Sequence, residues 1–214
     1  MFFVKRDTEM SQSIFISGNG TDVGKTVVSA CLVHALKADY WKPVQAGDVD
    51  FGDSDRIQKM AGESVGDIHP STYKLTEPMS PHAAAAIDGV DISLTDFRVP
   101  QTENNLIIEG AGGLLVPINE NETIVDLISH LGAQLVLVCA NYLGSINHSL
   151  LSIQTAKKVG IPIKGLIFFG ERNDESERII QKMGGVKRLG GVYPTEKVTS
   201  SNIHNYSGQF KGLL

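Results

Sequence analysis

The chain has 214 residues, of which 42% are hydrophobic and 20% are charged, and its formal net charge is −5 at pH 7. This length suits one α/β domain with a sizeable core, and the composition is typical of a soluble globular protein. The acidic balance excludes a general nucleic-acid surface, which needs basic residues, so we expect no nucleic-acid partner. The apolar start, residues 1–4, is too short for a secretory signal or a membrane span.

Two cysteines, Cys31 and Cys139, each lie inside an apolar stretch. This placement predicts reduced core thiols and not a disulfide or a metal pair. Residues 1–12 are predicted to form a polar extension ahead of the first strand. We therefore expect a cytoplasmic protein with no membrane partner.

The first predicted elements are a strand, a polar loop and a helix. An apolar run over 13–17 stops at Gly18, and the chain re-enters regular structure at Gly-Lys-Thr, residues 24–26, in a helix that extends to about Lys37. This pattern predicts a phosphate-binding loop, in which Lys25 reaches the β- and γ-phosphates and the Thr26 hydroxyl ligates magnesium. The strict motif has four residues between its glycines, whereas five separate Gly18 from Gly24, so Asn19 takes the place of the first glycine. The alternative is a chance Gly-Lys-Thr on an ordinary βα turn.

Apolar runs and helical patterns alternate along the remaining chain, as in a parallel sheet that is buried on both faces. A strand over 40–47 should leave into a turn, because Pro43 bars continuation of a ladder. Further strands are predicted at 105–108, 134–140, 163–169 and 189–192, and helices at 56–61, 83–87, 124–131, 145–159 and 174–183. No linker or repeat divides the chain. Residues 1–214 are therefore predicted to form one doubly wound α/β domain with a mostly parallel sheet flanked by helices.

In open parallel sheets, ligands bind beyond the carboxyl ends of the strands. Glu109 follows a predicted strand, where nucleoside triphosphatases place a magnesium-associated carboxylate; the alternative is a loop glutamate without a metal. Lys42 could neutralise a transferring phosphoryl group, and a surface lysine fits the pattern equally well. A second magnesium carboxylate could come from the acidic loop. Spacing does not choose among Asp48, Asp50, Asp53 and Asp55.

Six sequence blocks occur in the order found in dethiobiotin synthetases, and over residues 14–148 the chain resembles that family. The blocks are Gly-Thr-Asp-Val-Gly-Lys-Thr at 20–26, Lys-Pro-Val at 42–44, Asp-Ser-Asp at 53–55, Glu-Pro-Met-Ser-Pro-His at 77–82, Glu-Gly-Ala-Gly-Gly at 109–113 and Leu-Gly-Ser-Ile-Asn-His at 143–148. The resemblance implies a P-loop NTPase-like fold and an ATP- and Mg²⁺-dependent ligase of biotin synthesis. Diaminopelargonic acid and CO₂, or bicarbonate, would form a carbamate, ATP would phosphorylate it, and the second amine would close the ureido ring.

The resemblance also implies a role for particular residues. Lys25, Lys42 and Thr21 would be catalytic, and Thr26, Asp55 and Glu109 would hold magnesium, which selects Asp55 from the acidic loop. The other nucleotide-binding positions would be Asp22, Val23, Gly24, Val27, Gly110, Ala111 and Gly112, with Phe169, Gly170, Tyr193 and Pro194 towards the base. The substrate-binding positions would be Ala46, Ser80, Gly112 and Gly113, completed in a homodimer by Gly144 and Asn147 of the other subunit.

The chain departs from the family pattern at three places. Gly20 stands where some members have aspartate, Ala46 replaces a common hydroxyl residue, and Phe169-Gly170 replaces an Asn-Asp pair that reads the adenine edge. The alternative function is a dimeric P-loop ATPase switch of the chromosome-partitioning kind, although such proteins carry an extra lysine at the position of Gly20. A small-molecule kinase is a third possibility. The pattern does not assign the tail, 195–214, as a lid or a surface wrap.

Overall fold

The computed structural model describes residues 11–194 and 198–213. Seven parallel strands form one sheet in the order β4-β2-β6-β1-β7-β8-β9. The strands are β1 Ser13–Gly18, β2 Asp39–Trp41, β4 Ile68–His69, β6 Leu106–Gly113, β7 Gln134–Ala140, β8 Ile163–Phe169 and β9 Arg188–Val192. The predicted fold class, a doubly wound and mostly parallel sheet, is confirmed.

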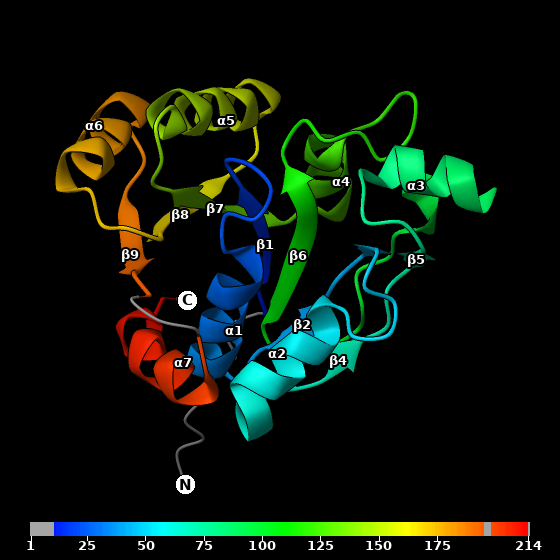
Figure 1. Ribbon diagram of the computed structural model, residues 1–214, viewed down its shortest axis with the longest axis horizontal. Coiled ribbons are helices and arrows are strands. Elements are labelled where there is room, and N and C mark those ends of the chain that lie inside the picture. The colour runs from blue at the N-terminus through cyan, green and yellow to red at the C-terminus, as the bar shows by residue number, and fades with distance from the viewer. Residues whose placement is uncertain (1–10, 195–197, 214) are drawn as a thin grey trace, which may run out of the picture.

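Helices cover both faces of the sheet (Figure 1). On one face lie α1 Lys25–Leu36, α2 Asp53–Ala61 and α7 Ser200–Ser207. On the other lie α4 Ile124–Leu131, α5 Ser145–Val159 and α6 Asp174–Gly184, with α3 Pro81–Asp88 beyond the β6 side. No helix in the described ranges is both long and apolar enough to cross a membrane.

The central strand, β1, shows why the apolar runs are continuous. Its neighbours are β6 and β7, and Ile14, Phe15 and Ile16 are fully buried. Ile14 and Ile16 pack with α1, whereas Phe15 packs with the cluster on the opposite face, because successive side chains of a strand alternate between faces. All three positions must therefore be apolar. The carboxyl end of β1 delivers the loop that begins at Asn19 to the top of the sheet.

The helices predicted at 56–61 and 83–87 begin earlier, at Asp53 and Pro81, and two predicted strands have wrong bounds by several residues. The expected strand over 40–47 divides at Lys42-Pro43, and the second piece, β3 Val44–Ala46, pairs with β5 Tyr73–Leu75 in a separate two-stranded sheet. Proline cannot donate to a ladder, so the chain changes sheets there. The strand expected to end before Glu109 continues to Gly113, which aligns with Gly18 of β1. Glu109 thus lies within β6, on a rigid strand and not in a loop.

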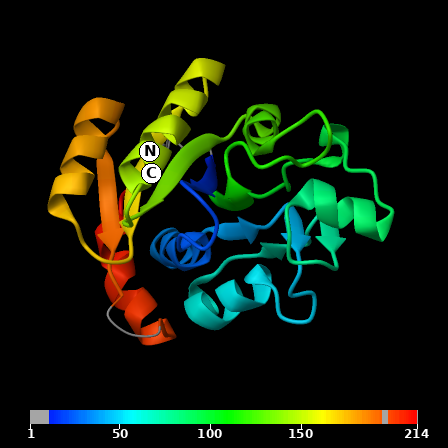
Figure 2. The same ribbon diagram turned by 45° about the horizontal axis from the view of Figure 1, so that its top comes forward.

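The described part of the tail wraps the surface of the sheet's α1 side. Ile203 of α7 and Phe210 are fully buried against the α1 cluster, and Figure 2 shows α7 and α2 alongside α1. Residues 1–10 of the predicted N-terminal extension lie outside the described residues.

Candidate active site

The loop between β1 and α1 forms an open anion site. Gly24 (φ 88°) and Asp22 (φ 56°) have left-handed backbones, and α1 begins without a side-chain cap, so the first amides of the helix have no side-chain partner. A Cβ at Gly18 would lie 2.4 Å from Val23 Cγ2, which requires glycine there. The Lys25 ammonium donates to the Gly20 carbonyl at 3.0 Å. These features are those of a phosphate-binding loop.

The loop opens into a cavity of about 660 Å³. Most of the predicted site residues line it: Thr21, Asp22, Val23, Gly24, Lys25, Thr26, Val27, Lys42, Ala46, Ser80, Glu109, Ala111, Gly112 and Phe169. These residues come from the ends of β1, β2, β3, β6 and β8 and from the starts of α1 and α3. The carboxyl edge of the sheet therefore gathers them, as the position of ligand sites in such sheets predicts.

Buried charges meet at the centre of the cavity. The Lys42 ammonium lies 2.7 Å from Asp53 Oδ2 and 3.2 Å from Glu109 Oε1. The Thr26 hydroxyl lies 2.9 Å from the same Glu109 oxygen and 3.2 Å from Asp53 Oδ1. Lys42 is 5% exposed and Glu109 1%, so neither is an ordinary surface group. The surface-lysine alternative for Lys42 is thereby excluded.

Burial and the neighbouring carboxylates have opposite effects on the pKa values of Lys25 and Lys42. Burial by itself would lower the pKa of Lys42, but the carboxylates of Glu109 and Asp53 outweigh it and raise that pKa above its ordinary value. For Lys25, burial dominates over the attraction of Glu109 and, with repulsion from Lys42, lowers the pKa to about 8. Lys42 therefore stays charged, held by its carboxylates, while Lys25 is poised for an anion that would stabilise its charge.

The carboxylate that contacts Lys42 and Thr26 belongs to Asp53, and not to Asp55, which the resemblance had selected as a magnesium ligand. Asp55 accepts the Gly52 amide at 2.8 Å and closes the capping box of α2, and it does not line the cavity. Residues two apart on a helix point in nearly opposite directions, so only one of the two can face inward. Ile57 and Ala61, the buried residues of α2, continue the four-residue spacing from Asp53. That spacing was the signal in the sequence that would have selected Asp53.

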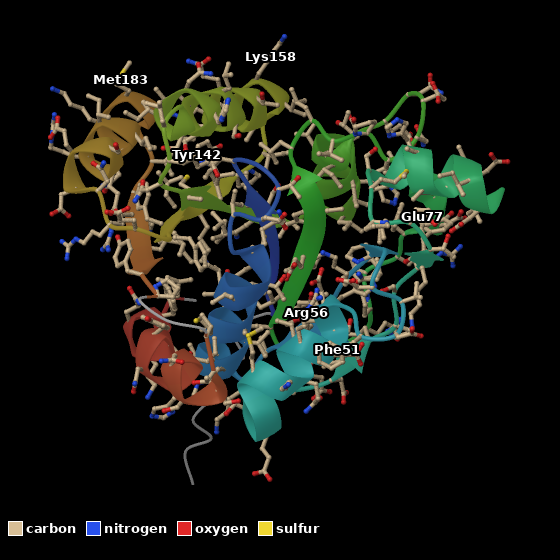
Figure 3. All side chains as sticks on the ribbon, viewed as in Figure 1. Phe51, Arg56, Glu77, Tyr142, Lys158 and Met183 are labelled. Atoms are coloured by element: carbon tan, nitrogen blue, oxygen red, sulfur yellow. The ribbon has the colours of Figure 1, made fainter. Side chains whose placement is uncertain are left out.

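Two polar residues that the sequence did not suggest, Gln45 and Arg56, organise the Asp53 side of the cavity. The buried Gln45 accepts the Asp53 amide at 3.1 Å and donates to the Gly47 carbonyl at 2.9 Å. Arg56 pairs with Asp53 Oδ1 at 3.2 Å and with Asp48 at 2.7 Å. Figure 3 shows Arg56 near the start of α2. Together they fix where α2 begins and hence where Asp53 points.

Relatives of known family match almost the whole chain. An ATP-dependent dethiobiotin synthetase BioD of Christiangramia forsetii is 46% identical over 205 residues, covering 96% of this chain and 99% of the relative. Another, of Cytophaga hutchinsonii, is 50% identical over 194 residues, covering 90% and 94%. The chain belongs to the dethiobiotin synthetase family. A family model described as an AAA domain also matches residues 12–202.

Dethiobiotin synthetases are ATP-dependent ligases, so the enzyme class expected from the six sequence blocks is confirmed. Solved structures show the wider fold. A plasmid partition protein of Borrelia burgdorferi has a TM-score of 0.54 and 12% identity, covering 94% of this chain and 98% of that one. The MinC:MinD complex of Aquifex aeolicus gives a TM-score of 0.53, 13% identity and coverages of 94% and 96%. At such identities these structures share the P-loop NTPase fold alone.

The remaining positions carried over from the dethiobiotin synthetases are not among the residues that line the cavity. Gly110 accepts Lys42 through its carbonyl at 3.2 Å, and Gly113 lies beside the Gly18 carbonyl. Gly170 and Pro194 follow β8 and β9, and the Tyr193 hydroxyl bonds Glu177 at 2.7 Å. Gly144 caps α5 and Asn147 lies in its exposed first turn.

Proposed function

We propose that this chain closes the ureido ring of dethiobiotin from diaminopelargonic acid, CO₂ and ATP, working as a single domain. One amine would attack CO₂ and lose a proton, which gives a carbamate. A carbamate oxygen would take the γ-phosphoryl group of ATP and release ADP. The second amine would then attack the carbonyl carbon, expel phosphate and form the cyclic urea. The observation that carries the proposal is the Lys42 ammonium, buried between Asp53 and Glu109 beside the phosphate-binding loop.

The residues divide this work by their positions. Lys25 and the first amides of α1 would bind the β- and γ-phosphates, and Thr21 lies on the cavity wall next to them. Lys42, a buried positive charge, would offset the charge that develops on the phosphoryl group and the carbamate. Ser80 and the Gly112 amide, which line the same cavity, would bind the diamine end, as the resemblance to the dethiobiotin synthetases implies. Ala46 offers this substrate only an apolar contact.

A magnesium ion would bind between Thr26, Asp53 and Glu109. Two oxygens in neighbouring positions of an octahedral magnesium shell, each about 2.1 Å from the ion, lie about 3.0 Å apart. The Thr26 hydroxyl is 2.9 Å from Glu109 Oε1 and 3.2 Å from Asp53 Oδ1, so each of these two pairs has about the separation of neighbouring ligands in such a shell. When bound, the ion would neutralise charge on the β- and γ-phosphates.

The two aspartates of α2 test this assignment as a matched pair. Asp53→Asn should raise the magnesium concentration for half-maximal turnover about tenfold or more. Asp55→Asn should leave that concentration unchanged while it weakens the start of α2 by about 1 kcal/mol. Magnesium titrations of turnover and thermal unfolding measure both effects. The opposite result, with Asp55→Asn alone changing the titration, would restore the original assignment.

We further propose a homodimer whose second subunit completes the substrate site. Support comes from Tyr142, Leu143 and Ile146, which expose apolar side chains beside the phosphate loop, with Leu143 fully exposed. Figure 3 shows Tyr142 beside the loop that joins β1 to α1. The amides at the start of α5 have no side-chain cap, and together with the exposed Asn147 side chain they would take the carboxylate of the partner's substrate.

We also propose that the protein works in the cytoplasm. Its two cysteines, Cys31 and Cys139, are buried and free, which fits a reducing compartment.

The product decides the function. The protein is incubated with diaminopelargonic acid, ¹³C-bicarbonate and Mg·ATP, and the product is identified by mass spectrometry. We expect labelled dethiobiotin, ADP and phosphate, with ATP turnover that depends on the diamine. ATP hydrolysis that ignores the diamine would favour the partitioning-type switch, whereas a stable phosphorylated product would favour a small-molecule kinase.

A further inference from the structure

The two carboxylate oxygens of Glu109 accept hydrogen bonds from different sides of the site. Its Oε1 accepts from the Thr26 hydroxyl at 2.9 Å and from the Lys42 ammonium at 3.2 Å, and both donors line the cavity. Its Oε2 accepts from the Tyr40 hydroxyl at 3.1 Å, and Tyr40 is not part of the cavity lining. One carboxylate oxygen therefore faces the reaction space, and the other is held from behind.

The sheet itself brings Tyr40 to Glu109. β2 and β6 are parallel neighbours in which Tyr40 aligns with Ile107, and Glu109 lies two residues further along β6 on the same face. The Tyr40 side chain is fully buried under α1 with Ile107 and Ile57. A hydroxyl buried so deeply needs a partner, and within the described residues its partner is Glu109. The position would otherwise suit an apolar ring.

We propose that Tyr40 is a positioning residue that holds Oε2 of Glu109 and so presents Oε1 to the divalent cation as a single oxygen ligand. This inference rests on the proposed magnesium site. Magnesium demands an octahedral shell with short bonds, in which a carboxylate contributes one oxygen, whereas calcium accepts both oxygens of a carboxylate at longer distances. A hydroxyl on Oε2 therefore disfavours the two-oxygen mode and selects for the smaller ion.

The variant that removes only this bond is Tyr40→Phe, because it keeps the ring and the packing. The matched control is Tyr73→Phe, which removes a tyrosine hydroxyl bonded to the carboxylate of Asp96 on the separate β3-β5 sheet. Each variant is titrated with Mn²⁺ in the presence of ADP, with free Mn²⁺ followed by electron paramagnetic resonance. Competition by Mg²⁺ and by Ca²⁺ is then measured in the same assay.

Tyr40→Phe should weaken Mn²⁺ binding about tenfold, the usual cost of losing a group that orients a metal ligand. It should also reduce the preference for Mg²⁺ over Ca²⁺, since Glu109 becomes free to bind with both oxygens. Tyr73→Phe should change neither quantity. A tyrosine that served only to pack the core would lower the unfolding temperature of Tyr40→Phe and leave the ratio of the two competing ions unchanged.

Glu109→Gln separates this inference from the proposed site. If Glu109→Gln weakens Mn²⁺ binding and Tyr40→Phe does not, the role of Tyr40 is refuted and the metal site stands. If Glu109→Gln also binds Mn²⁺ like the wild type, the metal assignment is wrong, and the role of Tyr40 fails with it.

Discussion

Two buried carboxylates, Asp39 and Glu109, lie at opposite ends of the β2-β6 strand pair and have different roles. Asp39, fully buried at the start of β2, accepts from the Asp67 amide at 2.9 Å, the Asn104 side-chain amide at 2.9 Å and His69 Nε2 at 3.1 Å. Glu109, on β6 at the other edge, accepts from Lys42, Thr26 and Tyr40. Both are almost completely removed from water, so burial alone does not distinguish a catalytic group from a structural one.

The donors make the difference. Asp39 is bound by a backbone amide and an amide side chain, and a Cβ at Gly66 would lie 2.2 Å from its Oδ1, so the loop around it leaves no room for a ligand. Glu109 is bound on its cavity side by an ammonium and a hydroxyl, which can exchange partners when an ion or a phosphate enters. Asp39 is thus saturated by groups of the surrounding fold, the His69 ring among them, and stabilises it, whereas Glu109 shares its donors with a cavity and is available for chemistry.

The largest effect on turnover should come from removing the Lys42 ammonium beside Glu109, at what we call the catalytic end of the β2-β6 pair. Lys42→Ala should lower turnover about a hundredfold or more, because Lys25 and the magnesium ion alone would then have to offset the charge that develops on the phosphoryl group and the carbamate. Steady-state kinetics measure this, with Lys74→Ala, an exposed lysine on β5, as the control. A turnover near that of the wild type would remove Lys42 from the mechanism.

The catalytic end should also depend on a second chain, whereas the Asp39 end is complete in one. Asn147→Ala and Lys42→Ala should each be inactive alone and regain activity when mixed. Random exchange makes about half of the dimers mixed, each with one intact site, so about a quarter of wild-type activity should return. No recovery despite subunit exchange, followed with differently tagged subunits, would mean that each site is complete within one subunit.

At the opposite end, Asp39→Asn should cost stability and spare catalysis. The substitution leaves buried donors without an acceptor, which should lower the free energy of unfolding by about 1 to 3 kcal/mol. kcat/KM should stay within about twofold, since Asp39 lies at the edge of the sheet away from the cavity. Urea unfolding and steady-state kinetics test the pair of expectations. A large loss of kcat/KM at unchanged stability would contradict the division between the two ends.

The pH dependence of stability should show the same division. Burial by itself would raise the pKa of Asp39, but its hydrogen bonds, including that from Asn104, outweigh burial and lower it. A carboxyl whose pKa is lower in the folded protein stabilises it fully above its ordinary pKa of about 3.9 and loses that contribution as the pH falls through the folded value. Acid unfolding of Asp39→Asn should therefore depend less on pH below about 4 than that of the wild type.

The smallest effect concerns the nucleotide base. The Phe169 ring packs directly on Gly24, where an added Cβ would lie 2.4 Å from the ring, and it offers stacking without hydrogen bonds. We expect ATP, GTP and CTP to support ring closure within about tenfold in kcat/KM, or about 1.4 kcal/mol. Phe169→Asn should increase the ratio of kcat/KM for ATP to kcat/KM for GTP and CTP. Steady-state kinetics with the three nucleotides test this, and a thousandfold preference of the wild type for ATP would reveal another base reader.

The local patterns of the sequence were sufficient for much of the fold. The bounds of α5, β7 and β8 match the predicted 145–159, 134–140 and 163–169, because each is a long apolar or periodic segment with clear ends. The phosphate loop was equally clear, since its chemistry needs neighbouring residues only. Boundaries failed at Pro43 and at Glu109, where pairing with distant strands decided how far each strand runs.

By itself, the sequence determined the doubly wound sheet, the phosphate loop and the candidates Lys42 and Glu109, because periodicity and short motifs act within a few residues. In the sequence, only the four-residue spacing of Asp53, Ile57 and Ala61 favoured Asp53 over Asp55, and the tertiary structure decided that Asp53 meets Thr26. The direction of this carboxylate depends on where α2 begins, which Gln45 fixes from β3 and Arg56 from the first turn of α2 itself. Tyr40 had no such signal, since only the register of β2 against β6 brings its hydroxyl to Glu109.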